Sequence, residues 1–116
     1  MATLATKVYL YLEANSKTWD AEKDNITLQN DTGTDYIKTW NVSGLAKPTD
    51  DQLATYNSSA TTEENNSVII RTRRKAYGDI GDQLDLLYKD MLADKGDKSG
   101  EWFKAIKAIK DANPKE

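Results

Sequence analysis

The chain of 116 residues contains no cysteine and no histidine. Without cysteine it forms neither disulfides nor thiolate nucleophiles, and without both residue types the usual zinc sites are excluded. Histidine is also the side chain whose ordinary pKa lies nearest to neutral pH, so acid and base catalysis would need strongly shifted carboxylates, lysines or tyrosines. We therefore expect a protein that is not an enzyme and that holds no cofactor.

Long apolar runs are also missing, and no segment approaches the roughly 20 apolar residues of a membrane helix. The first 15 residues lack the charged start and apolar core of a signal peptide, so we expect a protein made and kept in a cytoplasm, away from membranes. The net charge is −3 and no region is strongly basic, which argues against nucleic acid as a general partner. With 38% hydrophobic and 30% charged residues, the chain suits a small soluble domain, or a part that completes its core on a partner.

Residues 1–48 have the pattern of an antiparallel β region. Three segments alternate apolar and polar side chains as half-buried strands do: residues 6–12, 26–30 and 36–42. In the first of them, Val8, Leu10 and Leu12 would share one side of the strand. The sequence DTGTD at 31–35 is typical of a hairpin loop. We predict a small three-stranded antiparallel meander.

Residues 49–116 are predicted to be helical. Thr49 is followed by two aspartates that suit the first turn of a helix, because carboxylates there meet the positive end of the helix dipole. Apolar residues at spacings of 3 and 4 then favour one long helix over 49–76. The segment 57–67 is rich in Asn, Ser and Thr, which are weak helix formers, so a break within it is the alternative.

Two shorter helices are predicted after the long one. The first begins at Asp79, the expected N-cap, and has one apolar face made of Ile80, Leu84, Leu87, Tyr88 and Met91. We expect this row to pack against the long helix. The last helix covers 101–113 and is amphipathic. Strands followed by helices define the α+β fold class, with a small meander, a long helix and two shorter C-terminal helices.

Each of two charged clusters can be explained either as a binding site or as a structural feature of a helix. The acids Asp79, Asp82 and Asp85 are better explained as a cap and a solvated helix face than as a cation site, since calcium needs six to eight oxygens, usually from a loop. The run RTRRK at 71–75 suits the negative end of the long helix, and contact with nucleic acid is its alternative.

A family resemblance is centred on RRKAYGDIGDQLDLLYKDM (73–91), followed by WFKAIKAIKDANPK (102–115). It resembles a recurring C-terminal pattern of small bacteriophage proteins of the tail region. The upstream DYIKTWNVSGLAKPTDDQL (35–53) is similar to small phage fibre-assembly proteins. The residues that match the C-terminal pattern are Tyr77, Ile80, Gly81, Asp82, Gln83, Leu84, Asp85, Leu87 and Tyr88.

The resemblance implies a non-enzymatic structural protein of the virion, in the tail or fibre region, that is made in the bacterial host cytoplasm. Its expected partners are other virion proteins of the tail, fibre or capsid, and we expect it to be oligomeric or present in several copies. A tail-fibre assembly chaperone that is absent from the mature particle is the first alternative. A host-directed nucleic-acid-binding protein acting through Arg71, Arg73, Arg74 and Lys75 is the second. The candidate partner-binding residues are Trp40, Tyr77, Ile80, Gln83, Leu84, Leu87 and Tyr88.

Overall fold

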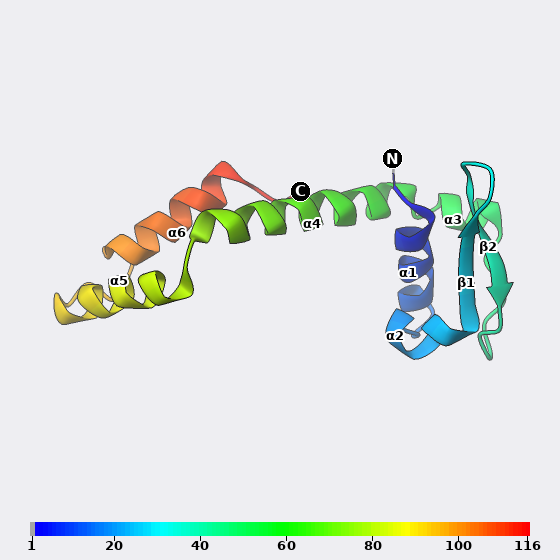
Figure 1. Ribbon diagram of the computed structural model, residues 1–116, viewed down its shortest axis with the longest axis horizontal. Coiled ribbons are helices and arrows are strands. Elements are labelled where there is room, and N and C mark those ends of the chain that lie inside the picture. The colour runs from blue at the N-terminus through cyan, green and yellow to red at the C-terminus, as the bar shows by residue number, and fades with distance from the viewer. Residues whose placement is uncertain (1) are drawn as a thin grey trace. The chain divides into compact units, whose positions relative to one another are not determined.

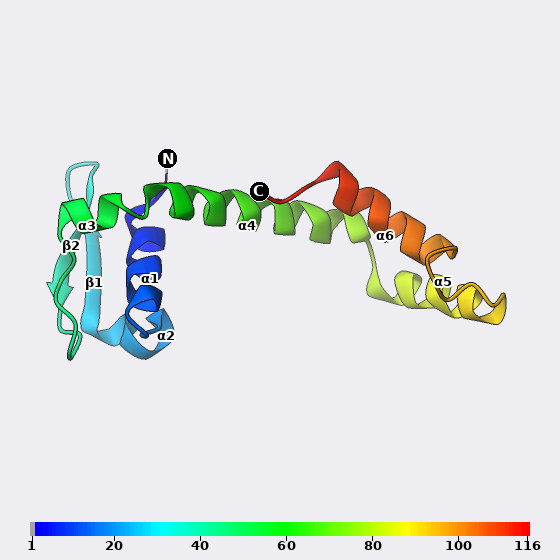
Figure 2. The ribbon, with the colours of Figure 1, turned by 180° about the vertical axis from the view of Figure 1, so that it is seen from behind.

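The structure is a computed structural model that describes residues 2–116, which form six α-helices and one two-stranded antiparallel sheet (Figures 1 and 2). The chain divides into two compact units, of which the first ends at Glu64 and the second spans Asn65–Glu116. The division falls within helix α4 (Asn57–Tyr77), which contributes residues to both units.

The first unit combines helices with a single β-hairpin. Its elements before α4 are α1 (Leu4–Ala14), α2 (Trp19–Glu22), a 3-10 turn (Lys23–Asn25), β1 (Ile26–Asn30), β2 (Asp35–Trp40) and α3 (Asp50–Ala54). In the hairpin, Ile26 pairs with Trp40 and Leu28 pairs with Ile37, with an irregularity in the ladder after Thr27. Helix α1 lies beside the hairpin in both views and also contacts α3 (Figures 1 and 2).

The prediction of a three-stranded meander is wrong, because the segment expected to be its first strand belongs to helix α1. Val8 and Leu12 are both fully buried, and residues four apart share a face in a strand as well as in a helix. Tyr11, seven residues after Leu4, lies on the same buried side, which only the helical period explains. Thr3 begins the helix by accepting a hydrogen bond from the backbone N–H of Thr6. The α+β class holds only loosely, with a two-stranded sheet.

The stretch predicted as one long helix over 49–76 forms two helices. Thr49 caps the short helix α3, and a capping box with Gln52 completes this start. The chain leaves the helix at 55–56 and re-enters it at Asn57, so the break lies before the Asn-, Ser- and Thr-rich segment rather than within it. That segment is helical despite its weak propensity. Within the first unit, Oε1 of Glu64 accepts hydrogen bonds from Thr3 and Thr6, and these bonds lower the pKa of this carboxyl.

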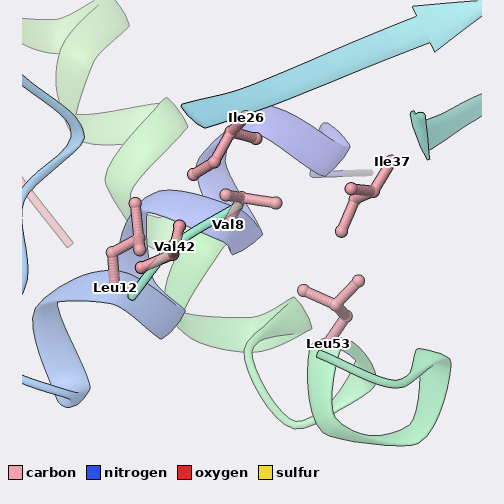
Figure 3. Packing of buried hydrophobic residues seen from close by; sticks show 6 residues of the cluster. All are labelled: Val8, Leu12, Ile26, Ile37, Val42 and Leu53. Atoms are coloured by element: carbon pink, nitrogen blue, oxygen red, sulfur yellow. The ribbon is translucent and has the colours of Figure 1, made fainter. Parts of the chain in front are cut away.

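The hydrophobic core belongs to the first unit and lies between α1, the hairpin and α3 (Figure 3). It consists of Val8, Leu12, Ile26, Ile37, Val42 and Leu53. Partly buried apolar residues close its edges, and among them Trp19 stacks on Tyr9 at a ring-centroid distance of 5.4 Å. The inward side chains of a two-stranded sheet are too few to make a core, so α1 supplies the apolar surface that the missing third strand would have provided.

The second unit contains the rest of α4 and two further helices, α5 (Ile80–Leu92) and α6 (Glu101–Ala112), which contact each other (Figure 1). Both lie where the sequence predicts them. After α6 the chain returns along α4, because Nε of Arg73 donates to the carbonyl oxygen of Asn113 at 2.8 Å, and the backbone N–H of Glu116 donates to the side chain of Asn66 at 2.9 Å. These bonds tie the end of the chain to α4.

Candidate protein-binding surface

The start of α5 forms as predicted. Gly78 ends the preceding helix with a φ of 78°, a left-handed conformation that glycine adopts without strain. The carboxylate of Asp79 then accepts hydrogen bonds from the backbone N–H groups of Gly81 and Asp82, at 2.7 and 3.2 Å. Asp79 therefore caps the helix, and Asp82 in its first turn complements the helix dipole.

One side of α5 presents large apolar side chains to solvent. Their exposed fractions lie between 60% and 73%, and we call this set the apolar stripe: Ile80, Leu84, Tyr88, Met91 and Leu92. At 3.6 residues per turn these five side chains fall within about 120° of the helix circumference. A contiguous exposed apolar row of this kind, unlike single exposed residues, is typical of a binding site.

The expectation that the apolar row of α5 packs against the long helix is wrong for most of its members. The less exposed side of the helix carries Gln83, Leu86, Leu87 and Asp90 instead. Of the predicted row, only Leu87 is half-buried, and it lies at the edge where the two sides meet. The face that packs is thus rotated away from the face that is most apolar.

The packed side of α5 carries the buried carboxylate of Asp90, which joins α5 to α6 at the corner between the two helices. Its Oδ2 atom accepts a hydrogen bond from the backbone N–H of Trp102 at 2.8 Å, in the first turn of α6. The N-cap residue of α6 is Gly100, which has no side chain to supply that bond. A Cβ atom at Gly100 would stand 2.2 Å from the carbonyl oxygen of Lys95 and 2.8 Å from Asp90 Oδ2. The corner therefore requires a remote cap and a glycine.

The second unit has little core of its own. Of residues 65–116, all of which the structure describes, no apolar side chain is buried. The apolar residues of α6 are only half-buried: Trp102, Phe103, Ile106 and Ile109. Phe103 and Ile106 also line an open depression on the outside of α6. Because apolar burial is the main favourable term in folding, this unit gains less from its own packing than the first unit does.

The residues predicted to bind a partner fall into four places. Ile80, Leu84 and Tyr88 lie in the apolar stripe, with Leu87 at its edge. Gln83 is half-buried and donates from Nε2 to the carbonyl oxygen of Gly78 at 3.2 Å, so it holds the helix start.

Two of the predicted residues lie elsewhere. Tyr77 is half-buried at the end of α4, beside Arg73 and Arg74. Trp40 belongs to the first unit, where it packs against the core and its Nε1 donates to the carbonyl oxygen of Leu45 at 2.9 Å. It is therefore separate from the stripe.

Two members of the stripe are missing from the predicted partner-binding residues. Met91 follows Ile80 at a spacing of 11, so the helical period could have placed it there. Leu92 follows Tyr88 at a spacing of four, so the same period extends the apolar face to it, at the edge of the stripe.

Hydrogen bonds shift the pKa values of several titratable groups. Tyr36 donates to Asp31, which lowers the pKa of the Asp31 carboxyl and raises that of the Tyr36 hydroxyl. Hydrogen bonds from Ser99 lower the pKa of Asp97. Each shift strengthens the charge state that the group already has at neutral pH. Among residues 2–116, no cluster of carboxylates is arranged to hold a metal ion, and no helix has the length and apolar character needed to cross a membrane.

Comparison with protein-family models, curated proteins and solved structures finds no match for this chain. The function is therefore inferred from the surface itself and from the sequence resemblance.

Proposed function

We propose that this protein is a non-enzymatic structural component of a bacteriophage virion, in the tail or fibre region, that binds other virion proteins through the apolar stripe. The observation that carries the proposal is the stripe: five large apolar side chains exposed side by side on one helix. The resemblance of residues 73–91 to tail-region proteins supplies the class of partner.

The apolar surface of the stripe is large enough to contribute to binding but too small to hold a partner without further contacts. Complete burial of a Leu, Ile or Met side chain contributes about 1.5–3 kcal/mol, so the exposed parts of the five side chains offer roughly 5–10 kcal/mol before costs. Association costs an estimated 4–15 kcal/mol in lost freedom of motion. The stripe alone therefore gives weak binding, and stable assembly requires several copies or a second contact surface. Both conditions are typical of components of a symmetric particle.

A matched pair of variants tests the role of the stripe. Leu84→Ser with Tyr88→Ser removes two of its members, and Asp85→Ser with Lys89→Ser changes two other exposed residues of the same helix with the same spacing. Neither pair alters the net charge of the chain. Each variant replaces the wild-type chain during infection of the host. We expect the purified particles to retain the control variant and to lose the stripe variant, as measured by quantitative mass spectrometry. Circular dichroism should show equal helix content for both variants.

The same measurement separates the proposal from its alternative. If the wild-type chain is absent from purified particles, it is not a virion component. If it is absent and its co-expression also raises the yield of folded fibre protein, it is an assembly chaperone. If both variants are retained in particles as well as the wild type is, the chain is a virion component but the stripe does not hold it there.

A further inference from the structure

A second surface of the Asn65–Glu116 unit is a groove lined by positive charge. It lies where α4, α6 and the last residues of the chain meet, and its volume is about 210 Å³. The lining residues are Ile70, Arg73, Arg74, Tyr77, Lys110 and Lys115, and we call this site the basic groove. Four of these six side chains are cations that come from three separate parts of the chain, and none is a carboxylate.

The cations of the groove have no carboxylate partner within 4.0 Å among the described residues. Lysines elsewhere on the same unit do have such partners. Lys89 pairs with Asp85 at 3.0 Å, and Lys104 pairs with Glu101 at 3.6 Å. Like charges that converge without a counter-charge repel each other, so the groove is an arrangement that an added anion would stabilise.

One of the four cations is held in place by the backbone. Arg73 donates from Nε to the carbonyl oxygen of Asn113 and from Nη2 to that of Lys110, at 2.8 and 3.3 Å. A guanidinium has five N–H donors, so three remain for a ligand. Because the side chain is already ordered, binding an oxyanion there costs little additional conformational entropy. Ile70 and Tyr77 add apolar surface beside this fork.

We propose that the basic groove binds carboxylate side chains of an acidic segment on a partner protein. This inference rests on the proposed function, because it supplies the second contact that the stripe requires. An arginine fork matches the two oxygens of a carboxylate, and the apolar part of the lining suits the aliphatic stem of a Glu side chain.

A nucleic acid fits the unit less well than a short acidic segment does. The second unit carries 11 Lys and Arg residues and 9 Asp and Glu residues, so its surface is close to neutral outside the groove. A polyanion with a charge every 3.4 Å along each strand would meet acidic as well as basic side chains of this unit where it extended beyond the groove. A segment with two or three carboxylates would not.

The test measures binding of a fluorescein-labelled peptide of ten glutamates to the full chain by fluorescence anisotropy in low salt. Arg74→Gln with Lys110→Gln and Lys115→Gln neutralises three cations of the groove and keeps Arg73, which anchors the end of the chain. Arg71→Gln with Lys95→Gln and Lys98→Gln is the control, since it removes the same charge from exposed positions outside the groove.

Each exposed ion pair contributes up to about a fivefold change in affinity. We therefore expect the groove variant to bind the peptide roughly tenfold more weakly than the wild type, and the control variant to bind within about threefold of it. Equal losses in the two variants would show that only net charge matters, and absence of peptide binding by the wild type would overturn the proposal directly.

Two other probes decide the class of ligand. A labelled single-stranded DNA of 20 nucleotides that bound more tightly than the peptide, and lost binding in the groove variant alone, would assign the groove to nucleic acid and refute the carboxylate proposal. Inorganic phosphate that displaced the peptide at equal concentration would reduce the groove to a site for any small oxyanion, which also refutes it. A negative result in the peptide-binding test does not change the result expected for the stripe variants in particles, so the two proposals can fail separately.

Discussion

Removal of the Asp90 carboxylate should loosen α6 without disturbing the first unit. In the variant Asp90→Ala, the backbone N–H of Trp102 loses its acceptor at 2.8 Å, and the start of α6 loses the negative charge beside it. Loss of an N-cap acceptor costs about 1 kcal/mol, and loss of a carboxylate near the helix N-terminus costs about 0.3–1 kcal/mol. We therefore expect α6 to lose roughly 1.5–2 kcal/mol of local stability.

Hydrogen exchange of individual amides, followed by NMR, measures this loss directly. A change of 1.4 kcal/mol in the opening free energy is a tenfold change in exchange rate, so amides in the middle of α6 should exchange about 10- to 30-fold faster in Asp90→Ala. Asp90→Asn keeps an oxygen acceptor and removes only the charge, and it should give an increase of about two- to fivefold. Amides of α1 provide the internal control, because they should not change.

Asp85→Ala is the matched control variant. It removes an exposed aspartate of the same helix, and this aspartate contacts Lys89 rather than α6. If α6 amides exchange equally fast in Asp85→Ala and Asp90→Ala, the remote cap does not hold α6. If Asp90→Asn is as damaging as Asp90→Ala, the charge rather than the hydrogen bond is the main contribution.

Three further predictions concern stability and can be measured by urea unfolding of the full chain. Gly100→Ala should destabilise the second unit by about 1–3 kcal/mol, because the added Cβ would collide with the backbone. Gly96→Ala is the control and should cost less, because its Cβ would meet only a methionine side chain at 3.1 Å. Equal effects of the two substitutions would contradict this prediction. Leu12→Ala should cost about 2–5 kcal/mol in the core, and Leu92→Ala on the exposed stripe less than about 0.5 kcal/mol. Because hydrogen bonds lower the folded-state pKa of Glu64, its contribution to stability is present above the ordinary value of 4.5 and is lost as the pH falls through the lowered folded value. Glu64→Gln should therefore be less stable than the wild type at pH 7, and this difference should shrink towards pH 3; a constant difference would contradict the assignment.

Features that depend on neighbours in the sequence could be predicted. Thr49 and Asp79 start helices as expected, because a cap contacts backbone groups only two or three residues away. The hairpin loop at 31–35 and the amphipathic helix at 101–112 follow from equally local patterns.

The first helix was missed, although the spacing of Leu4, Val8, Tyr11 and Leu12 follows the helical period. Val8 and Leu12 fit a strand and a helix equally well, and the choice depends on whether the hairpin can offer a third pairing edge or an apolar face. Burial against Ile26 and Ile37 decided it in favour of the helix.

The candidate binding surfaces were predictable in part. The apolar face of α5 is visible in the sequence, and three of its exposed residues were among the predicted ones: Ile80, Leu84 and Tyr88. The exposure of this face was not visible in the sequence, because a helical period identifies an apolar face without showing what covers it. The basic groove brings Arg73 and Arg74 next to Lys110 and Lys115, which lie about 40 residues further along the chain, and no local pattern connects them.

Local sequence patterns were sufficient to locate the start of three of the six α-helices that residues 2–116 form, to identify apolar helix faces, and to exclude histidine and cysteine chemistry. Which of those faces are covered depends on how the helices pack. The reason is that capping and periodicity act over about one helical turn, whereas burial depends on contacts between residues that are far apart in the chain. Asp90 shows the difference: it is buried on the packed side of α5, where it accepts a hydrogen bond from Trp102, 12 residues away, while the apolar stripe of the same helix stays exposed.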